Sequence, residues 1–494
     1  MHKDLTLKRS TSSYRATPPA SLDAGDVQAF VPPLLGKAVV VSVFYTILIG
    51  LLVGAYWMVL PPELPIKALQ AALVVGFTLG AWAFGLLDEP TPTLFFFLLV
   101  VLFGIAPTDV VFSGFSSTAW WLVFGGSVLG VAIKTTGLGT RIAAVVFSGK
   151  TQAYNGYLLR VALVSVVLAF LMPSTTGRIL LLTPIVLALA KELGFEPGSN
   201  GHTGLVLAVA ASSYMPPTAI LPANLPNSVL LGAAESMYGI HLSYGSYLLA
   251  HFPILGVLKA LVIVVVITYL FPESRPCQPL ARSKGHRLSS EEQRLFWVLA
   301  FSVLLYMTDF IHGISPAWVS LGAAIVCLLP AMNIISTKAL TDGVHITPLI
   351  YVAGFLGLGA VVADSGIGFT LGRSLLTWTA ISPDHPAAAA ASLTAIGAGI
   401  GLITTLPSLP AVLTPLASEF SNASGLSLNS ILMLQVPAFG LLLFPYQCPP
   451  IILAMTMGSV RLKDATKLFL AVALITVLVL FPLDYLWWRQ LGLI

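Results

Sequence analysis

An arginine, Arg178, stands in one of the most apolar stretches of the chain, LMPSTTGRILLLTP (171–184). Three hydroxyl residues, Ser174, Thr175 and Thr176, come just before it. A spacing of four places Ser174 and Arg178 on the same face of a helix. A helix that begins here presents free N–H groups and the positive end of its dipole, and a guanidinium adds a bidentate grip on carboxylate or sulfate. The motif therefore indicates that the hydroxyls and the guanidinium bind a small anion.

The same residues have a second interpretation that involves no substrate. An arginine in an apolar segment can snorkel towards the lipid headgroups or pair with a carboxylate on another segment. Serine and threonine hydroxyls also bond the backbone or neighbouring helices inside membranes. We favour anion binding by Arg178, because ionisable residues within membrane segments are rare and usually functional.

The composition places this motif in a membrane protein. Hydrophobic residues make up 57% of the 494 positions and charged residues 9%, against about 25% charged in an ordinary soluble protein. The first 35 residues are polar and lack the apolar core of an export signal, and the three cysteines have no metal spacing. The expected fold is an all-α polytopic membrane protein.

Apolar runs of roughly twenty residues, the length that spans a bilayer, recur along the chain. The uninterrupted runs are 38–60, 66–86, 90–106, 118–137, 247–271, 295–312, 315–332, 345–363 and 465–487. Prolines interrupt 203–235 and 427–458, which predicts two broken helices. The runs 154–193 and 385–420 are apolar on both sides of a polar, proline-bearing centre, which predicts two re-entrant helical hairpins. With hairpins counted as non-crossing, we expect about eleven transmembrane helices.

A polar segment divides the chain into two similar halves. The predicted parts are a cytoplasmic tail (1–37), a first half (38–271), a cytoplasmic linker (272–294) and a second half (295–494). With the tail inside, most of the 24 lysines and arginines fall on the cytoplasmic side, as the positive-inside rule requires. This topology puts the N-terminus in the cytoplasm and the C-terminus outside, in what we expect to be a bacterial inner (plasma) membrane.

The two halves repeat each other with inverted topology. VFGGSVLGVAIKTTGLG (123–139) and VAGFLGLGAVVADSGIG (352–368) share glycines at a constant offset. Ser174 and Thr405 each stand ten positions before a matching proline. Six crossings in the first half and five in the second make matching elements start from opposite faces. Inverted repeats indicate a secondary transporter whose site lies near mid-membrane, where hairpin tips and unwound helices meet.

These features together resemble the divalent-anion/sodium symporter family of dicarboxylate, citrate and sulfate carriers. The resemblance covers about 38–487 and rests on TTGLGTRIA, PSTTGRILLLTPI, PANLPN and CPPIILAMTMGS in this order. It implies a homodimer with a scaffold and an elevator-like transport domain, and hairpin tips that touch both sodium and the substrate carboxylate. The tentative sodium ligands are then Ser174, Thr176, Asn224, Thr405 and Pro407. Beyond possible sodium ions, we expect no cofactor or metal.

The chain departs from the family pattern at both tips. The first tip carries Thr175 where the family has the asparagine of Ser-Asn-Thr, and the second carries Leu406 at that place. Each change removes an amide that could bind carboxylate or sodium. We hypothesise that Arg178 partly replaces a sodium ion as countercharge, which predicts exchange or weak sodium dependence.

The predicted function is secondary transport of a small di- or tricarboxylate-like anion, coupled to sodium or to a counter-substrate. Asn227, Thr404 and Thr405 complete the predicted substrate-binding set, and buried Lys259 is expected to pair with Asp364 or Glu235. The alternatives are a carrier of a monocarboxylate or of an inorganic or sulfonate oxyanion with little sodium dependence, and an anion channel. An enzyme is not expected, since the chain has no His-Glu-x-x-His or Gly-x-Ser-x-Gly motif. Expected partners are the anion, membrane lipid and a second copy, without nucleic acid.

Overall fold

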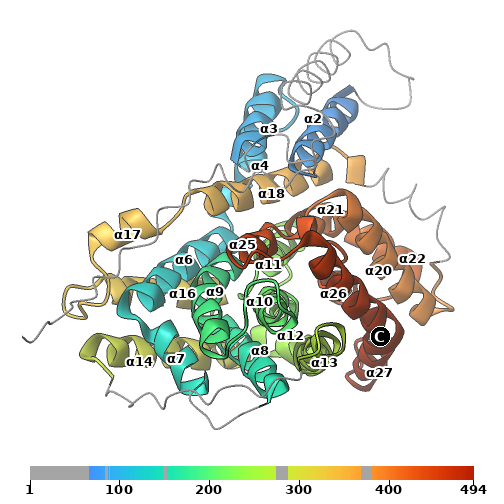
Figure 1. The fold of residues 1–494 in the computed structure, drawn as a ribbon. Coiled ribbons are helices and arrows are strands. Elements are labelled where there is room, and N and C mark those ends of the chain that lie inside the picture. Colours follow the sequence, from blue (N-terminus) through green and yellow to red (C-terminus); the bar gives the residue numbers. More distant parts are fainter. Residues whose placement is uncertain (1–65, 84–86, 88–89, 148–152, 274–287, 369–380) are drawn as a thin grey trace, which may run out of the picture.

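The regular structure of the described residues is entirely helical (Figure 1). The computed structural model describes residues 66–83, 87, 90–147, 153–273, 288–368 and 381–494. The predicted tail, the first predicted span at 38–60 and most of the predicted linker lie outside these residues. The all-α polytopic fold predicted from composition and apolar runs is confirmed.

Helices occupy the uninterrupted apolar runs within the described residues. The single helices are α2 (Ile66–Ala83), α3 (Pro90–Leu102), α6 (Thr118–Thr136), α14 (Ser290–Met307), α16 (Pro316–Leu328) and α18 (Thr347–Asp364). The short helices between spans are α4 (Thr108–Val111), α5 (Ser113–Ser116), α7 (Leu138–Phe147), α15 (Asp309–His312) and α17 (Thr337–Gly343). Among the described residues five helical segments are long and apolar enough to cross a membrane. The first predicted span lies outside these residues, and several other apolar helices are shorter, at 10–17 residues.

Two of the long helices contain a π-helical stretch next to a proline. The segments α12 (Tyr244–His251), η3 (Phe252–Leu258) and α13 (Lys259–Leu270) form one continuous helix. The segments α26 (Leu462–Ile475), η7 (Thr476–Leu480) and α27 (Phe481–Gln490) form the other. Proline has no N–H to donate, so the local change in hydrogen-bond register lets each helix pass Pro253 or Pro482 without ending.

The first predicted hairpin and the first predicted break are built from two helix pairs. In the hairpin, α8 (Tyr154–Leu171) and α9 (Thr175–Glu192) contact each other and are joined by three residues, Met172 to Ser174. In the break, α10 (Asn200–Ser212) ends before a 3-10 turn, η2 (Pro216–Ala219), and α11 (Leu225–Tyr238) continues after it. Since α10 is buried along nearly its whole length, the break lies inside protein, where unwound backbone can find partners.

The second half uses shorter pieces in the corresponding places. Its hairpin region contains α20 (Pro386–Ile403), η4 (Leu406–Ser408), α21 (Leu409–Leu413), η5 (Thr414–Leu416) and α22 (Ala417–Ser424). Its broken helix contains α23 (Leu428–Met433), α24 (Gln435–Phe439), η6 (Pro445–Gln447) and α25 (Pro449–Met457). Prolines at 407, 410 and 415 stand at the starts of the 3-10 turns and of α21, and they divide the second arm because each removes a backbone donor.

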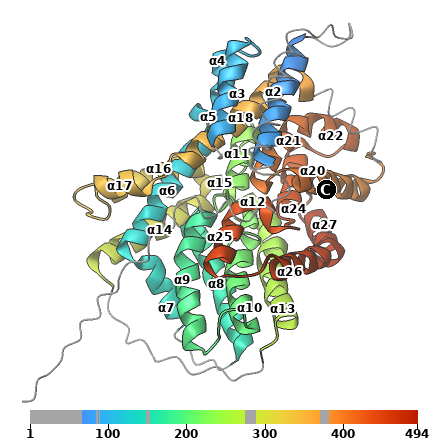
Figure 2. The same ribbon diagram turned by 45° about the horizontal axis from the view of Figure 1, so that its top comes forward.

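The two halves pack crosswise (Figures 1 and 2). Helix α25, which follows the second break, lies against α9 and α10 of the first half. Helix α11, which follows the first break, lies against η4 and α21 of the second half. Each hairpin is therefore next to the helix that leaves the other half's break.

Candidate substrate site

The first hairpin tip is a tight turn capped by its own serine. Ser174 is the N-cap of α9, and its hydroxyl accepts a bond from the Gly177 N–H at 3.1 Å. Gly126 of α6 lets the turn approach, since a Cβ there would lie 2.3 Å from the Pro173 ring. Thr175 is buried and Thr176 is exposed. The tip thus offers the Thr176 hydroxyl to the surroundings, while Ser174 serves the helix.

Arg178 is completely buried and bonds to oxygens of both the tip and the first break. One terminal nitrogen donates to the carbonyls of Met172 (2.5 Å) and Ala223 (2.9 Å). The other donates to the Ser213 carbonyl (2.7 Å) and to Asn224 Oδ1 (2.8 Å). Those carbonyls belong to the hairpin turn and to the two ends of the break. The guanidinium therefore ties the tip to the break with four short bonds.

A fifth oxygen and a bare N–H complete the surroundings of Arg178. Thr175 Oγ1 lies 3.3 Å from a terminal nitrogen, and its hydroxyl donates to Asn224 Oδ1 at 2.8 Å. The Nε–H of Arg178 is buried and has no hydrogen-bond partner among the described residues. Among the described residues, no carboxylate lies within 4.0 Å of the guanidinium. The second interpretation of the sequence, in which the arginine snorkels or pairs with a carboxylate, does not fit this geometry.

The two predicted asparagines satisfy backbone freed by the break. Asn224 donates to the Tyr214 carbonyl at 2.8 Å. Asn227 donates to two carbonyls within η2 and to that of Ile220 just after it, which is the nearest at 2.6 Å. Asn227 Oδ1 is buried and accepts no hydrogen bond from the part of the chain that the structure describes. Both amide NH₂ groups are thus engaged with the protein, and only an acceptor oxygen of Asn227 is left open.

The second tip is held by neutral groups. The Thr404 hydroxyl donates to Ile400 O at 3.1 Å, so it is used within its own helix. Thr405 Oγ1 shares a hydrogen bond of 3.2 Å with the Tyr351 hydroxyl of α18. Pro407 lies in η4, and Ser408 donates to the Thr405 carbonyl at 2.6 Å. These contacts fix the turn but bring no charge to it.

The second break is held by a glutamine and a lysine. Gln447 Oε1 accepts from the N–H groups of Leu443 (2.8 Å) and Phe444 (2.9 Å), and its amide donates to Gly401 O at 2.5 Å. Lys259 is completely buried and donates to Gly440 O at 2.7 Å. The glutamine therefore links the second break to the end of α20, as Arg178 links the first break to its tip.

The predicted pairing of Lys259 is wrong. Asp364 is exposed at the end of α18, and Glu235 accepts from the Thr118 hydroxyl and lies 3.4 Å from His241. Lys259 instead interacts electrostatically with the buried carboxylate of Asp484 on α27. Unwinding at the second break frees the Gly440 carbonyl, which accepts its hydrogen bond.

The two breaks meet through a tyrosine. Tyr214, at the end of α10, donates from its hydroxyl to Phe439 O, at the end of α24, at 2.9 Å. Cys448, which precedes α25, lies close enough to Arg178 to interact with it electrostatically. Sequence reasoning missed Tyr214 and Tyr351, although a tyrosine hydroxyl within an apolar run is a signal of a buried polar partner.

The structure gathers the predicted residues into two groups. The first group surrounds the first tip and break and consists of Ser174, Thr175, Thr176, Arg178, Asn224 and Asn227. The second group, Thr404, Thr405 and Pro407, lies at the second tip, which packs on α11 just after the first break. Within the described residues, no group of histidine, cysteine and carboxylate side chains could hold a metal ion. The polar chemistry therefore concentrates in the first group.

Comparison with known proteins identifies relatives of this arrangement. A family model described as "Citrate transporter" matches residues 81–440. A membrane protein of Cupriavidus necator is 22% identical over 87% of this chain and 89% of its own length. The citrate/succinate antiporter of Escherichia coli K12 is 27% identical, but the match covers only 46% of this chain and 49% of the antiporter.

A solved structure has the same general fold. The YdaH transporter of Alcanivorax borkumensis aligns with a TM-score of 0.50 over 87% of this chain and 99% of that one, at 15% sequence identity. At that identity the likeness concerns the fold alone. The family match, in contrast, covers well over half of the chain. The chain therefore belongs to the citrate transporter family, as its tips and breaks predicted.

Proposed function

We propose that this protein exchanges small carboxylates across the membrane and uses a counter-substrate instead of sodium. The citrate/succinate antiporter, a relative over about half its length, is an exchanger by name. The family model adds support for a carboxylate as substrate. The proposal depends most on what surrounds Arg178.

The observation that carries the proposal is a shell of oxygens around a permanent cation. Three backbone carbonyls, Asn224 Oδ1 and Thr175 Oγ1 lie around the guanidinium of Arg178. Unwound backbone carbonyls are the groups that coordinate sodium in transporters with broken helices. In this chain the same kind of shell is filled by a side chain that cannot dissociate, so no sodium ion is needed there.

A fixed cation favours exchange over net transport. When the anion leaves, the charge of Arg178 stays in the site with no carboxylate of the described residues within 4.0 Å. Moving an uncompensated charge through the membrane is costly, and the membrane potential adds about 2.3 kcal/mol per charge for each 100 mV. The empty site therefore reorients slowly, and a second anion must bind before it returns.

Arg178 acts on the substrate as countercharge rather than as a bidentate clamp. Four of its five N–H groups already donate to protein oxygens, and within the described residues the Nε–H has no acceptor. A carboxylate at the tip meets the Thr176 hydroxyl and the N-terminal end of α9, with the buried cation behind them. Arg178 is thus not proposed to bind the anion through two hydrogen bonds, as the sequence predicted, but it still supplies the predicted compensating charge.

The proposed movement is of the elevator type, with the two hairpins and the two broken helices travelling together. The crosswise packing of α25 on α9 and of α11 on η4 supports this grouping, and Tyr214 joins the breaks. A homodimer with a scaffold and an elevator-like transport domain is the assembly that the family resemblance implies. Both remain parts of the proposal.

A smaller substrate is the second candidate. The amide NH₂ groups of Asn224, Asn227 and Gln447 all donate to backbone carbonyls. Fewer free donors favour an anion with one carboxylate or one sulfonate over a tricarboxylate.

A counterflow experiment distinguishes these candidates. Purified protein in proteoliposomes is loaded with one unlabelled anion and offered a labelled one, using succinate, citrate, lactate and sulfate. We expect labelled succinate or citrate to accumulate only when a carboxylate is inside. Preference for lactate or sulfate would favour the second candidate, and ionic currents without counterflow would indicate a channel.

A further inference from the structure

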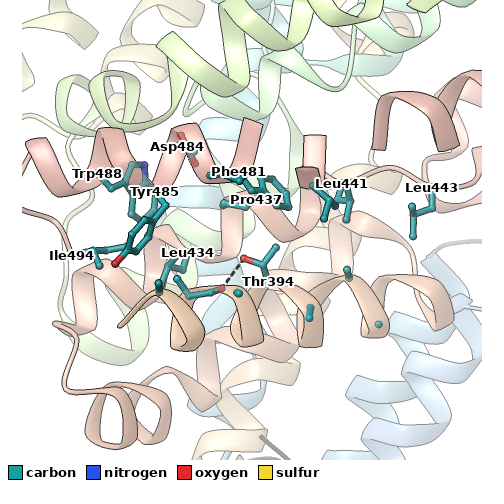
Figure 3. Close-up of a pocket in the computed structure, with 18 of the residues that line it drawn as sticks. Thr394, Leu434, Pro437, Leu441, Leu443, Phe481, Asp484, Tyr485, Trp488 and Ile494 are labelled. Atoms are coloured by element: carbon teal, nitrogen blue, oxygen red, sulfur yellow. Dashed lines mark hydrogen bonds between the residues drawn. The ribbon is translucent and has the colours of Figure 1, made fainter. Parts of the chain in front are cut away.

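A hollow of about 710 Å³ separates α20 from α27 in the second half (Figure 3). Phe481 and Tyr485 of α27 line one side, and Leu441 and Leu443 of the second break line another. Its volume falls in the range of roughly 300–1,000 Å³ that holds a drug-sized ligand. It is separate from the oxygen shell of Arg178 and shares no lining residue with that shell.

The remaining side of the hollow is a row of small residues on α20. Ala387, Ala391, Ala395 and Gly399 follow each other at four-residue spacing, and all four are exposed. Such rows normally let another helix pack closely in a membrane. Within the described part of the chain α20 packs on α24 and α21, while the row of small residues faces the hollow. The small side chains therefore widen the hollow instead of closing a helix contact.

The lining of the hollow suits an apolar ligand. The Thr394 hydroxyl donates to Ala390 O at 3.0 Å, and Trp488 Nε1 donates to Ala250 O at 3.1 Å. Asp484 also lines the hollow; it is buried and interacts electrostatically with Lys259, and in Figure 3 its side chain points away from that of Tyr485. A carboxylate substrate would find little to bond there, so the hollow is not a second substrate site.

Membrane lipid is the occupant that the surroundings supply. An apolar cavity does not hold water well, and an empty one forfeits dispersion contacts in proportion to its volume. The helices that form its walls also carry exposed apolar side chains, Leu402 (42% exposed), Leu483 (40%) and Leu486 (53%). In a membrane protein such faces meet acyl chains, so acyl chains stand at the rim of the hollow.

We propose that this hollow binds an acyl chain of a membrane phospholipid, which supports the second break. The acyl chain would lie against Leu441 and Leu443. The Leu443 N–H donates one of the hydrogen bonds by which Gln447 holds the break. Occupancy therefore restrains the unwound segment from the lipid side. This inference is independent of the substrate and of the sodium question.

The test fills the hollow with a side chain. Ala391→Phe places a ring in it, and Ala388→Phe is the matched control, since Ala388 is exposed on the same helix but does not line the hollow. Each protein is purified in detergent, examined by native mass spectrometry, and its Tm is measured with and without added phosphatidylethanolamine and phosphatidylglycerol. We expect the native protein and A388F to retain a phospholipid and gain Tm from added lipid, and A391F to lose both properties.

Two results would overturn the proposal. One is that A391F retains phospholipid and gains Tm as the native protein does. The other is that A391F changes the mass of the oligomer without changing lipid retention, which would assign the hollow to a second copy of the chain. If A391F does not fold, the smaller Ala395→Leu change is measured in the same way, with Ala388→Leu as its control.

Discussion

The two hairpin tips solve the same structural problem with different chemistry. The first tip begins a continuous α9, capped by Ser174 and tied to the first break by the cation of Arg178. The second tip begins a 3-10 turn, and the neutral Gln447 ties its neighbourhood to the second break. A charged donor bonds carbonyls more strongly than an amide does. We therefore expect the Arg178 bonds at the first tip and break to stabilise the protein more than the Gln447 bonds at the second.

The largest expected effect comes from removing the first tie. Arg178→Met removes a charged donor from three buried carbonyls and from Asn224 Oδ1, which costs more than about 3 kcal/mol. Met172 O keeps the Ser174 N–H and Asn224 Oδ1 keeps the Thr175 hydroxyl, so the Ser213 and Ala223 carbonyls lose most. We expect a large fall in Tm in detergent and loss of exchange. Arg178→Lys is the control for charge, and it should recover only part of both because an ammonium cannot reproduce the fork.

The same variant sharpens the account of the oxygen shell. With the guanidinium gone, its oxygens are free to take a small cation, so sodium should raise the Tm of R178M. The native protein should show no such gain beyond that given by equal potassium. A native protein stabilised by sodium as strongly as R178M would mean that the arginine does not occupy a cation position.

The second tie should matter less. Gln447→Leu leaves the N–H groups of Leu443 and Phe444 and the Gly401 carbonyl unpaired, at about 1–3 kcal/mol for each group that water does not reach. Because the second break also receives Lys259 at Gly440, we expect a smaller fall in Tm than for R178M. If Gln447→Leu lowered the Tm as much as R178M or more, the Gln447 bonds would be at least as important for stability as the Arg178 bonds.

The smallest expected effect lies at the second tip itself. Tyr351→Phe removes one shared hydrogen bond to Thr405 and keeps the ring, so we expect about 1 kcal/mol or less. Exchange should persist with altered substrate affinity if Thr405 contacts the anion. If substrate affinity were unchanged in both Y351F and Thr405→Val, Thr405 would not contact the substrate.

The helices were readable from the sequence, and most side-chain partners were not. Apolar runs and prolines predicted the positions of α8, α9, α10 and α11 because spanning length and missing donors leave a direct mark. Arg178 and Lys259 were recognisable as buried cations, but their partners are mainly backbone carbonyls exposed by unwinding. Which carbonyls turn towards a cation depends on the local path of the break, and residue types do not specify that path.

The halves also differ more than their repeated motifs predicted. Ser174 and Thr405 occupy matching positions, yet one caps a helix and the other bonds a tyrosine on α18. The prolines that follow Thr405 explain the difference, since they replace the first turn of an α-helix with 3-10 turns. A shared pattern in two repeats therefore fixed the place of the tip and not its bonding.

The central claim is that Arg178 supplies the charge that sodium supplies elsewhere in such sites. The most direct measurement is carboxylate counterflow by the native protein in proteoliposomes, with sodium on both sides or replaced throughout by N-methylglucamine. We predict equal exchange rates in the two conditions. Exchange that stops when sodium is removed and returns when it is restored would contradict the claim.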